Sequence, residues 1–251
     1  MTIRMHEPQH TGLASKPGAW NELALTLPVF LAYQLGVVFL DVRNATDLVT
    51  ERLLELSHGD RLGYLELTGG IGLVTVVAFG VLGRGQALRI GRLVQTCLEG
   101  ATYATAMGTA SSWVVGKLFA GVRPPAVAGP ITGLVMALGA GFYEELAFRV
   151  ILFGVGAKIL VRLLSNQRVG FVQDVAPLRA SAIVVMGLWA VVCAAVFSAV
   201  HYTGPLGDSF ELRSFVARAL LGLALTLVYA TRGFAAAVWT HVLYDVWVLV
   251  L

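Results

Sequence analysis

The sequence predicts an all-α protein, a polytopic bundle of seven to eight transmembrane helices with one broken helix near Gly139 and Gly141. The first observation is composition. Of 251 residues, 57% are hydrophobic and only 13% are charged, whereas soluble domains average about 25% charged residues. The second is a mean hydropathy of +0.77. The third is the recurrence of apolar stretches of about 20 residues, the length of a membrane-spanning helix.

The first half of the chain predicts a polar tail followed by membrane helices. Residues 1–22 are polar, and residues 23–125 contain three apolar stretches of spanning length. The predicted spans are residues 23–40, 62–82 and 93–120. The third ends close to Arg123, which two prolines follow, and this combination stops a helix.

A short helix at the membrane surface is predicted between the first two spans. The connecting segment, residues 41–61, is rich in acids and arginines. It also carries leucines at spacings that predict one apolar helix face. These leucines are Leu48, Leu53, Leu54 and Leu56.

Residues 126–161 form an apolar stretch that is too long for one straight span. At 1.5 Å per residue this stretch would measure about 54 Å as an α-helix, and the hydrocarbon core of a bilayer is about 30 Å thick. Gly139 and Gly141 predict a break, with a second helix over residues 142–164. Glu144 and Glu145 would then lie at the start of that helix, where its partial positive charge favours carboxylates.

Three more spans are predicted at residues 180–201, 215–229 and 234–251. Residues 126–251 therefore form a second group of helices within one membrane domain. The distribution of Lys and Arg over the connecting segments favours a cytoplasmic N-terminus. We attribute the net charge of +3 to this topology. The sequence contains no basic patch interleaved with aromatic residues, which would indicate nucleic-acid binding. We expect a lipid bilayer, and no nucleic acid, as partner.

Glu144, Glu145 and Arg149 are the only charged residues between residues 127 and 155. One unpaired charge at the centre of a membrane helix costs roughly 2.5–3.5 kcal/mol, so packing alone does not account for three. Glu145 and Arg149 lie four residues apart, which predicts an ion pair within the helix. Glu144 points about 100° away from Glu145 and needs partners elsewhere, which indicates a chemical role.

Two later spans carry histidines at membrane depth. His201 ends one span, and His241 lies four residues before Asp245 in the last span. This spacing puts Asp245 on the same helix face as His241, where it can orient the imidazole. Because the helices of Glu144 and His201 are antiparallel neighbours, we expect all four side chains to converge slightly inside the membrane.

These residues make up three motifs in chain order. They are Glu-Glu-x-x-x-Arg at 144–149, Phe-x-x-x-His at 197–201 and His-x-x-x-Asp at 241–245. The pattern resembles that of the CAAX-protease and bacteriocin-processing (CPBP, or Abi) family of intramembrane proteases, over residues 126–251. The resemblance implies a membrane-embedded endopeptidase of the glutamate type.

The resemblance also implies a role for each residue. Glu144 and His201 would activate a water for attack on a peptide carbonyl, and His241 and Asp245 would stabilise the oxyanion. The supporting residues would be Glu145, Arg149 and Phe197, and Phe197 is expected only to pack.

Position 245 needs its own explanation. The family pattern allows Asn or Asp there, but only an amide or a protonated acid donates a hydrogen bond to an oxyanion. Asp245 is therefore either protonated or orients a protonated His241. We favour the second reading, because a charged donor forms the stronger hydrogen bond.

Two other functions remain open. Glu144, His201 and His241 match the His₂Glu ligand set of catalytic zinc sites, although no HExxH motif is present and Glu144 would then be lost as a base. The glutamate mechanism needs no cofactor. The non-enzymatic alternative is a bacteriocin-immunity or scaffold protein, a role described for some family members.

The expected substrate is a membrane-anchored protein or peptide, which the short loops of this prokaryote-like chain of 251 residues favour over a prenylated tail. By the same resemblance we expect a multi-pass protein of a bacterial inner membrane. The sequence does not indicate an oligomeric state.

Overall fold

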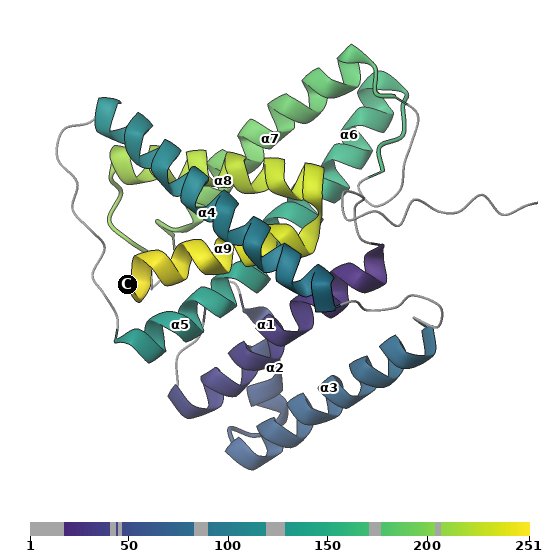
Figure 1. The fold of residues 1–251 in the computed structure, drawn as a ribbon, viewed down its shortest axis with the longest axis vertical. Helices are drawn as coiled ribbons and strands as arrows, with labels where there is room; N and C mark the ends of the chain where they lie inside the picture. Colours follow the sequence, from purple (N-terminus) through teal and green to yellow (C-terminus); the bar gives the residue numbers. More distant parts are fainter. Residues whose placement is uncertain are drawn as a thin grey trace, which may run out of the picture.

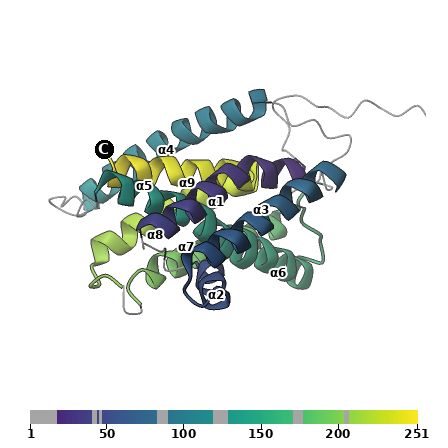
Figure 2. The same cartoon turned by 90° about the horizontal axis from the view of Figure 1, so that it is seen from below.

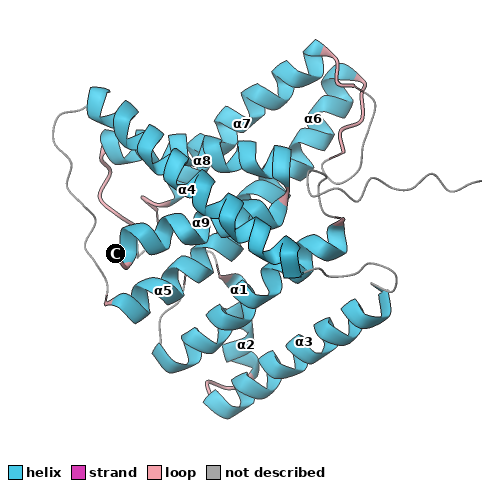
Figure 3. Cartoon of the chain, viewed as in Figure 1, coloured by secondary structure: helices cyan, strands magenta, loops and turns pink. Residues whose placement is uncertain are grey.

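The computed structural model describes residues 18–40, 44, 47–82, 90–118, 129–170, 177–203 and 207–251. The predicted tail up to residue 17 and the helix stop at Arg123 lie outside these residues. The elements, labelled in Figure 1, are α1 (Ala19–Leu40), α2 (Leu48–Leu56), α3 (Arg61–Leu82), α4 (Ile90–Leu118), α5 (Pro130–Gly139), η1 (Ala140–Val155), α6 (Gly156–Ser165), α7 (Ala180–Val200), α8 (Leu212–Arg232) and α9 (Phe234–Leu249). Throughout the described residues the regular structure is helical (Figure 3), which confirms the all-α prediction.

The bundle is that of an integral membrane protein. Within the part of the chain that the structure describes, three helices are long and apolar enough to cross a bilayer, and a fourth is apolar but shorter. They are Trp20–Leu40, Ala180–Val200 and Leu212–Arg232, and then Phe234–Leu249. The outward face of α7 exposes large apolar side chains such as Ile183 and Leu188, as expected of a surface that faces lipid. The count of seven to eight spans stays a prediction.

The first helix begins earlier than predicted. α1 starts at Ala19, and its Glu22, assigned to the polar tail, lies in the first turn and is buried. The Oε2 atom of Glu22 accepts a hydrogen bond of 2.5 Å from the backbone N–H of Ala235 at the start of α9. A carboxylate is stabilised at a helix start, so Glu22 ties the beginning of α1 to the beginning of α9.

The helix predicted between the first two spans is α2, and Leu53 and Leu56 on it differ in burial. Asp47 caps it by accepting a 2.8 Å hydrogen bond from the backbone N–H of Thr50. Leu53 is buried beside Tyr64, whereas Leu56 is 67% exposed. The inward face also carries the fully buried Thr50, so α2 is held by polar as well as apolar contacts.

At the expected break, α5 ends at Gly139 and a different type of helix begins at Ala140, but the chain does not leave the helical conformation. The chain stays helical from Pro130 to Ser165, with ordinary right-handed values at Gly139 (φ −65°, ψ −50°). Instead the hydrogen-bonding pattern changes, because Ala140–Val155 form a π-helix, in which each N–H bonds five residues back. A π-helix holds more residues per turn, so this segment is shorter than the straight α-helix assumed in the prediction.

The two glycines also allow close packing. A side chain at Gly139 would overlap the ring of Tyr33 on α1, and one at Gly141 would overlap Val242 on α9. Small residues let membrane helices approach each other closely. Because the two glycines lack side chains, the junction of α5 and η1 can lie close to α1 and α9.

α9 is the central helix of the bundle. It contacts α1, α4, α5, α8 and η1, and Figure 2 shows it running beneath α4. Its first half is rich in alanine and is buried from Phe234 to Val238. This position explains why His241, one turn further along, is only 5% exposed.

Candidate active site

Glu145 and Arg149 form the predicted ion pair. Glu145 Oε1 lies 3.0 Å from Arg149 Nη1, and the two side chains are 0% and 1% exposed. Arg149 also donates to the carbonyl oxygen of Gly222 on α8 at 3.4 Å. The prediction from the i,i+4 spacing is thus confirmed, and the buried arginine is paired as a charge away from water must be.

Glu145 has a second partner that the sequence did not indicate. Its Oε1 accepts a 2.7 Å hydrogen bond from Nδ1 of His241 on α9. The second ring nitrogen of His241, Nε2, lies 3.5 Å from Asp245 Oδ2. The expected approach of Asp245 to the imidazole is therefore present, and Glu145 makes a shorter contact with the other ring nitrogen.

Glu144 points to the other side of η1 and meets both histidines. Its Oε2 lies 3.9 Å from His201 Nε2 and 4.0 Å from His241 Nε2. The expected convergence of Glu144, His201, His241 and Asp245 is therefore present, and it brings together η1, α9 and the C-terminal end of α7.

His201 has a fixed ring orientation. It is the residue that follows α7, and its Nδ1–H donates to the carbonyl oxygen of Phe197 at 2.8 Å. This hydrogen bond leaves Nε2 facing Glu144. The side chain of His201 is 27% exposed, against 9% for that of Glu144, so the group opens to the outside on the His201 side.

Phe197 packs at the centre of this group, as expected. Its ring lies 4.3 Å from the guanidinium carbon of Arg149, a cation–π distance. It also meets the rings of Phe148, His201 and His241 edge-on, at 5.2, 5.1 and 6.2 Å. Phe197 thus contacts Arg149 and both histidines without offering a reactive atom.

Asn44 is a polar neighbour that the sequence reasoning missed. It lies between α1 and α2, is buried, and its Nδ2 donates to Glu144 Oε1 at 3.2 Å. A hundred residues separate the two, and the connecting segment was assigned to the membrane surface. No spacing rule links them, so only the fold reveals the contact.

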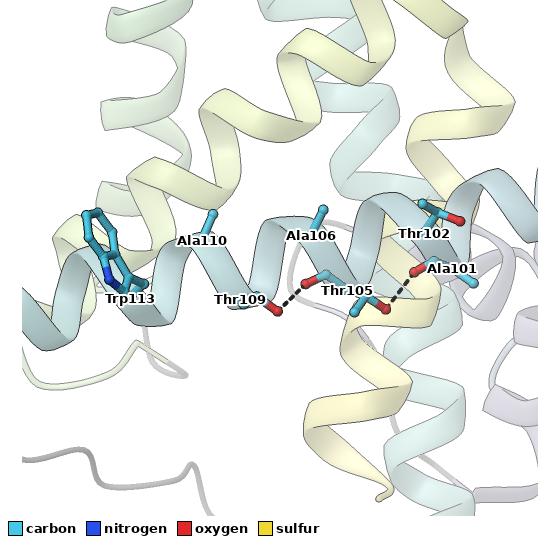
Figure 4. Close-up of a pocket in the computed structure, with 7 residues that line it drawn as sticks. All are labelled: Ala101, Thr102, Thr105, Ala106, Thr109, Ala110 and Trp113. Carbon is cyan, nitrogen blue, oxygen red and sulfur yellow. Dashed lines mark hydrogen bonds between the residues drawn. The ribbon is translucent and has the colours of Figure 1, made fainter.

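Two other features of the described residues bear on the site. No group of three or more His, Cys, Asp or Glu is arranged there to hold a metal ion. A shallow hollow on α4, between Ala101 and Trp113, is lined by alanines and threonines (Figure 4). It contains none of the charged residues of the site.

The chain was also compared with known proteins. Residues 126–247 match the family model described as type II CAAX prenyl endopeptidase Rce1-like. This segment contains Glu144, His201, His241 and Asp245, but not Asn44. Neither a curated protein nor a solved structure matches the chain. Residues 126–247, just under half of the chain, therefore match the Rce1-like CAAX-protease family, in agreement with the CPBP resemblance predicted from the motifs.

Proposed function

We propose that this protein is an intramembrane endopeptidase that hydrolyses a peptide bond of a membrane-associated protein or peptide. Glu144 and His201 activate the attacking water, and His241 and Asp245 lie at the oxyanion. The family supports a peptidase. The mechanism rests on one observation, the meeting of Glu144 Oε2 with the Nε2 atoms of both histidines at 3.9 and 4.0 Å.

These distances suit a water or a substrate oxygen between the three atoms. A separation of 3.9 Å is too long for a direct hydrogen bond, and polar groups at such distances are commonly bridged by water. A water in hydrogen-bond reach of Glu144 Oε2 meets the geometric requirement for general-base catalysis. His201 Nε2, a free acceptor when Nδ1–H binds Phe197, would hold the same water.

His241 is placed to act as the donor to the oxyanion. Its Nδ1–H is taken by Glu145 at 2.7 Å, so Nε2 is the atom that faces Glu144 and the reacting groups. A protonated His241 would present Nε2–H there, with Asp245 Oδ2 at 3.5 Å as a nearby counter-charge. Charged donors stabilise an oxyanion more strongly than neutral ones.

The reaction then follows in two steps. Glu144 removes a proton from the water while the water oxygen forms a bond to the carbonyl carbon, and the carbonyl oxygen becomes an oxyanion bound by His241. The oxyanion collapses, the C–N bond breaks, and the proton held by Glu144 passes to the leaving nitrogen. The products are a new carboxyl terminus and a new amino terminus.

Mass spectrometry of membrane proteins tests this proposal in cells that express either the wild type or Glu144→Gln. Loss of a general base lowers the rate by about 10²–10⁴-fold, so one or more uncut membrane proteins should accumulate with the variant. Glu66→Gln is the matched control, because Glu66 is an exposed glutamate on α3. If both variants give the wild-type pattern, the protease proposal fails and the immunity or scaffold alternative is favoured.

A further inference from the structure

We propose that Asn44 is a positioning residue of the catalytic centre, whose amide holds the Glu144 carboxylate with Oε2 directed at the two histidines. The inference rests on the proposed function and extends it. Asn44 lies outside residues 126–247, so the N-terminal helices would contribute directly to catalysis.

The contact divides the two oxygens of Glu144 between two tasks. Oε1 accepts the 3.2 Å hydrogen bond from Asn44 Nδ2, while Oε2 is the atom nearest to both histidines. Rotation of the carboxylate would break the bond to Asn44. The amide therefore keeps one oxygen free for the water and fixes its direction, which is how supporting residues preorganise a reacting group.

A neutral donor suits this position. Asn44 stabilises the carboxylate by a hydrogen bond without supplying a positive charge that would compete for it. Arg149, the buried cation of the same helix, is held by Glu145 instead. Glu144 thus has a neutral orienting partner, while the buried cation of the same helix is bound to Glu145.

Asn44 is itself held against η1. Its backbone N–H donates to the hydroxyl of Tyr33 at 2.9 Å. Tyr33 is fully buried and packs edge-on against Tyr143, the neighbour of Glu144, with ring centroids 5.5 Å apart. The ring of Tyr33 also occupies the space left by Gly139, the last residue of α5, so a small residue just before η1 makes room for the side chain that holds Asn44.

A second set of hydrogen bonds fastens the same segment to η1. Gln34 of α1 donates to the Tyr143 hydroxyl at 2.7 Å and accepts from Thr50 Oγ1 of α2 at 3.2 Å. All three of these side chains are buried. Because buried polar networks hold their members in one arrangement when satisfied, α1 and α2 are fixed relative to Glu144 on both sides of Asn44.

Enzyme kinetics of Asn44→Asp and Asn44→Ala distinguish positioning from a merely structural role. The probe is a farnesylated CAAX peptide with a fluorophore and a quencher on either side of the scissile bond, or the substrate found by the proteomic comparison. Asn44→Asp keeps the shape but puts a carboxylate against Glu144, so it should be the more damaging change. For both variants we expect kcat to fall about 10- to 100-fold, with the larger loss in Asn44→Asp. The KM of each variant should stay within about twofold of the wild-type value.

The control is Asn166→Asp, the same change at an exposed asparagine, which should leave kcat unaltered. If Asn44 only shapes the connection between α1 and α2, Asn44→Asp should be milder than Asn44→Ala. That order would overturn this inference, and loss of cleavage in Glu144→Gln would still support the proposed function.

Cross-linking tests the contact without any substrate. In a background with Cys97→Ser and Cys193→Ser, the double variant Asn44→Cys, Glu144→Cys should be bridged in membranes by a short membrane-permeant bifunctional thiol reagent, because two hydrogen-bonded side chains together span more than a disulfide. The cross-link is identified by mass spectrometry of the digested chain. The pair Asn166→Cys, Glu144→Cys should not be bridged. Failure of the first pair to cross-link would contradict the inference even if no substrate is cleaved.

Discussion

Glu145 Oε1 accepts a 2.7 Å hydrogen bond from His241 Nδ1, and the same oxygen lies 3.0 Å from Arg149 Nη1. One buried oxygen therefore links the guanidinium of η1 to the imidazole of α9. The two adjacent glutamates differ accordingly. Glu145 contacts the Arg149 guanidinium and Nδ1 of His241. Glu144 instead faces Nε2 of His201 and of His241, and its other carboxylate oxygen accepts a hydrogen bond from the Asn44 amide.

We predict that Glu145→Gln lowers the free energy of unfolding much more than Glu144→Gln does. Removal of one member of a buried ion pair leaves the other charge uncompensated, at a cost of roughly 3–5 kcal/mol. Glu144 lies further from the protonated His241, at 4.0 Å from its Nε2, so its replacement should abolish cleavage with a smaller loss of stability. Unfolding of the purified variants in detergent micelles measures the difference. Equal destabilisation by the two changes would contradict this division of roles.

Asp245→Asn should retain activity, within about tenfold of the wild type. Glu145 already orients His241 through Nδ1, and an amide at position 245 would add a second donor near the oxyanion. The measurement is kcat/KM on the substrate that accumulates with Glu144→Gln. Complete inactivation would instead show that His241 needs the charge of Asp245, which lies 3.5 Å from its Nε2.

Metal chelation should not inactivate the enzyme if Glu144 is the base. Zinc would require Glu144, His201 and His241 as ligands, and the carboxylate would then be bound to metal and lost as a proton acceptor. The purified protein is treated with a strong chelator, dialysed and assayed with and without added zinc. Loss of activity that zinc alone restores would overturn the glutamate mechanism in favour of a zinc peptidase.

The convergence of these side chains could be predicted from the sequence because its cues are local. The i,i+4 spacing of Glu145 and Arg149 gave the buried pair, and the order of the apolar stretches indicated that His201 ends its helix beside the start of the Glu144 helix. The cost of a charge in an apolar segment drew attention to these residues. Such cues need no knowledge of how distant helices pack.

Local cues do not reveal packing. Gly139 and Gly141 suggested a break because glycine is a weak helix former, and in the fold they also admit Tyr33 and Val242. Asn44 and the bond between Glu145 and His241 join segments about a hundred residues apart. No periodicity within one helix reports such contacts, since they depend on which helices become neighbours.

We predict that Gly141→Ala destabilises the protein and lowers its activity together. The added methyl group would overlap the side chain of Val242 and would lie 3.0 Å from the Val242 backbone nitrogen and 3.1 Å from the Val238 carbonyl oxygen. Backbone atoms cannot turn aside, so η1 must move away from α9. Overpacking of this kind costs about 1–3 kcal/mol, and the shift would also separate Glu144 from His241.

Gly70→Ala is the control for this change. Gly70 also lies in a helix, α3, but no heavy atom lies within 4 Å of the position of an added Cβ. There the higher helix propensity of alanine should stabilise the protein by up to about 1 kcal/mol. Unfolding in micelles should therefore show that Gly141→Ala is less stable and Gly70→Ala more stable than the wild type. In the cleavage assay only Gly141→Ala should lose activity. If Gly141→Ala behaves like Gly70→Ala, the close approach of η1 to α9 is not what positions Glu144 beside His241.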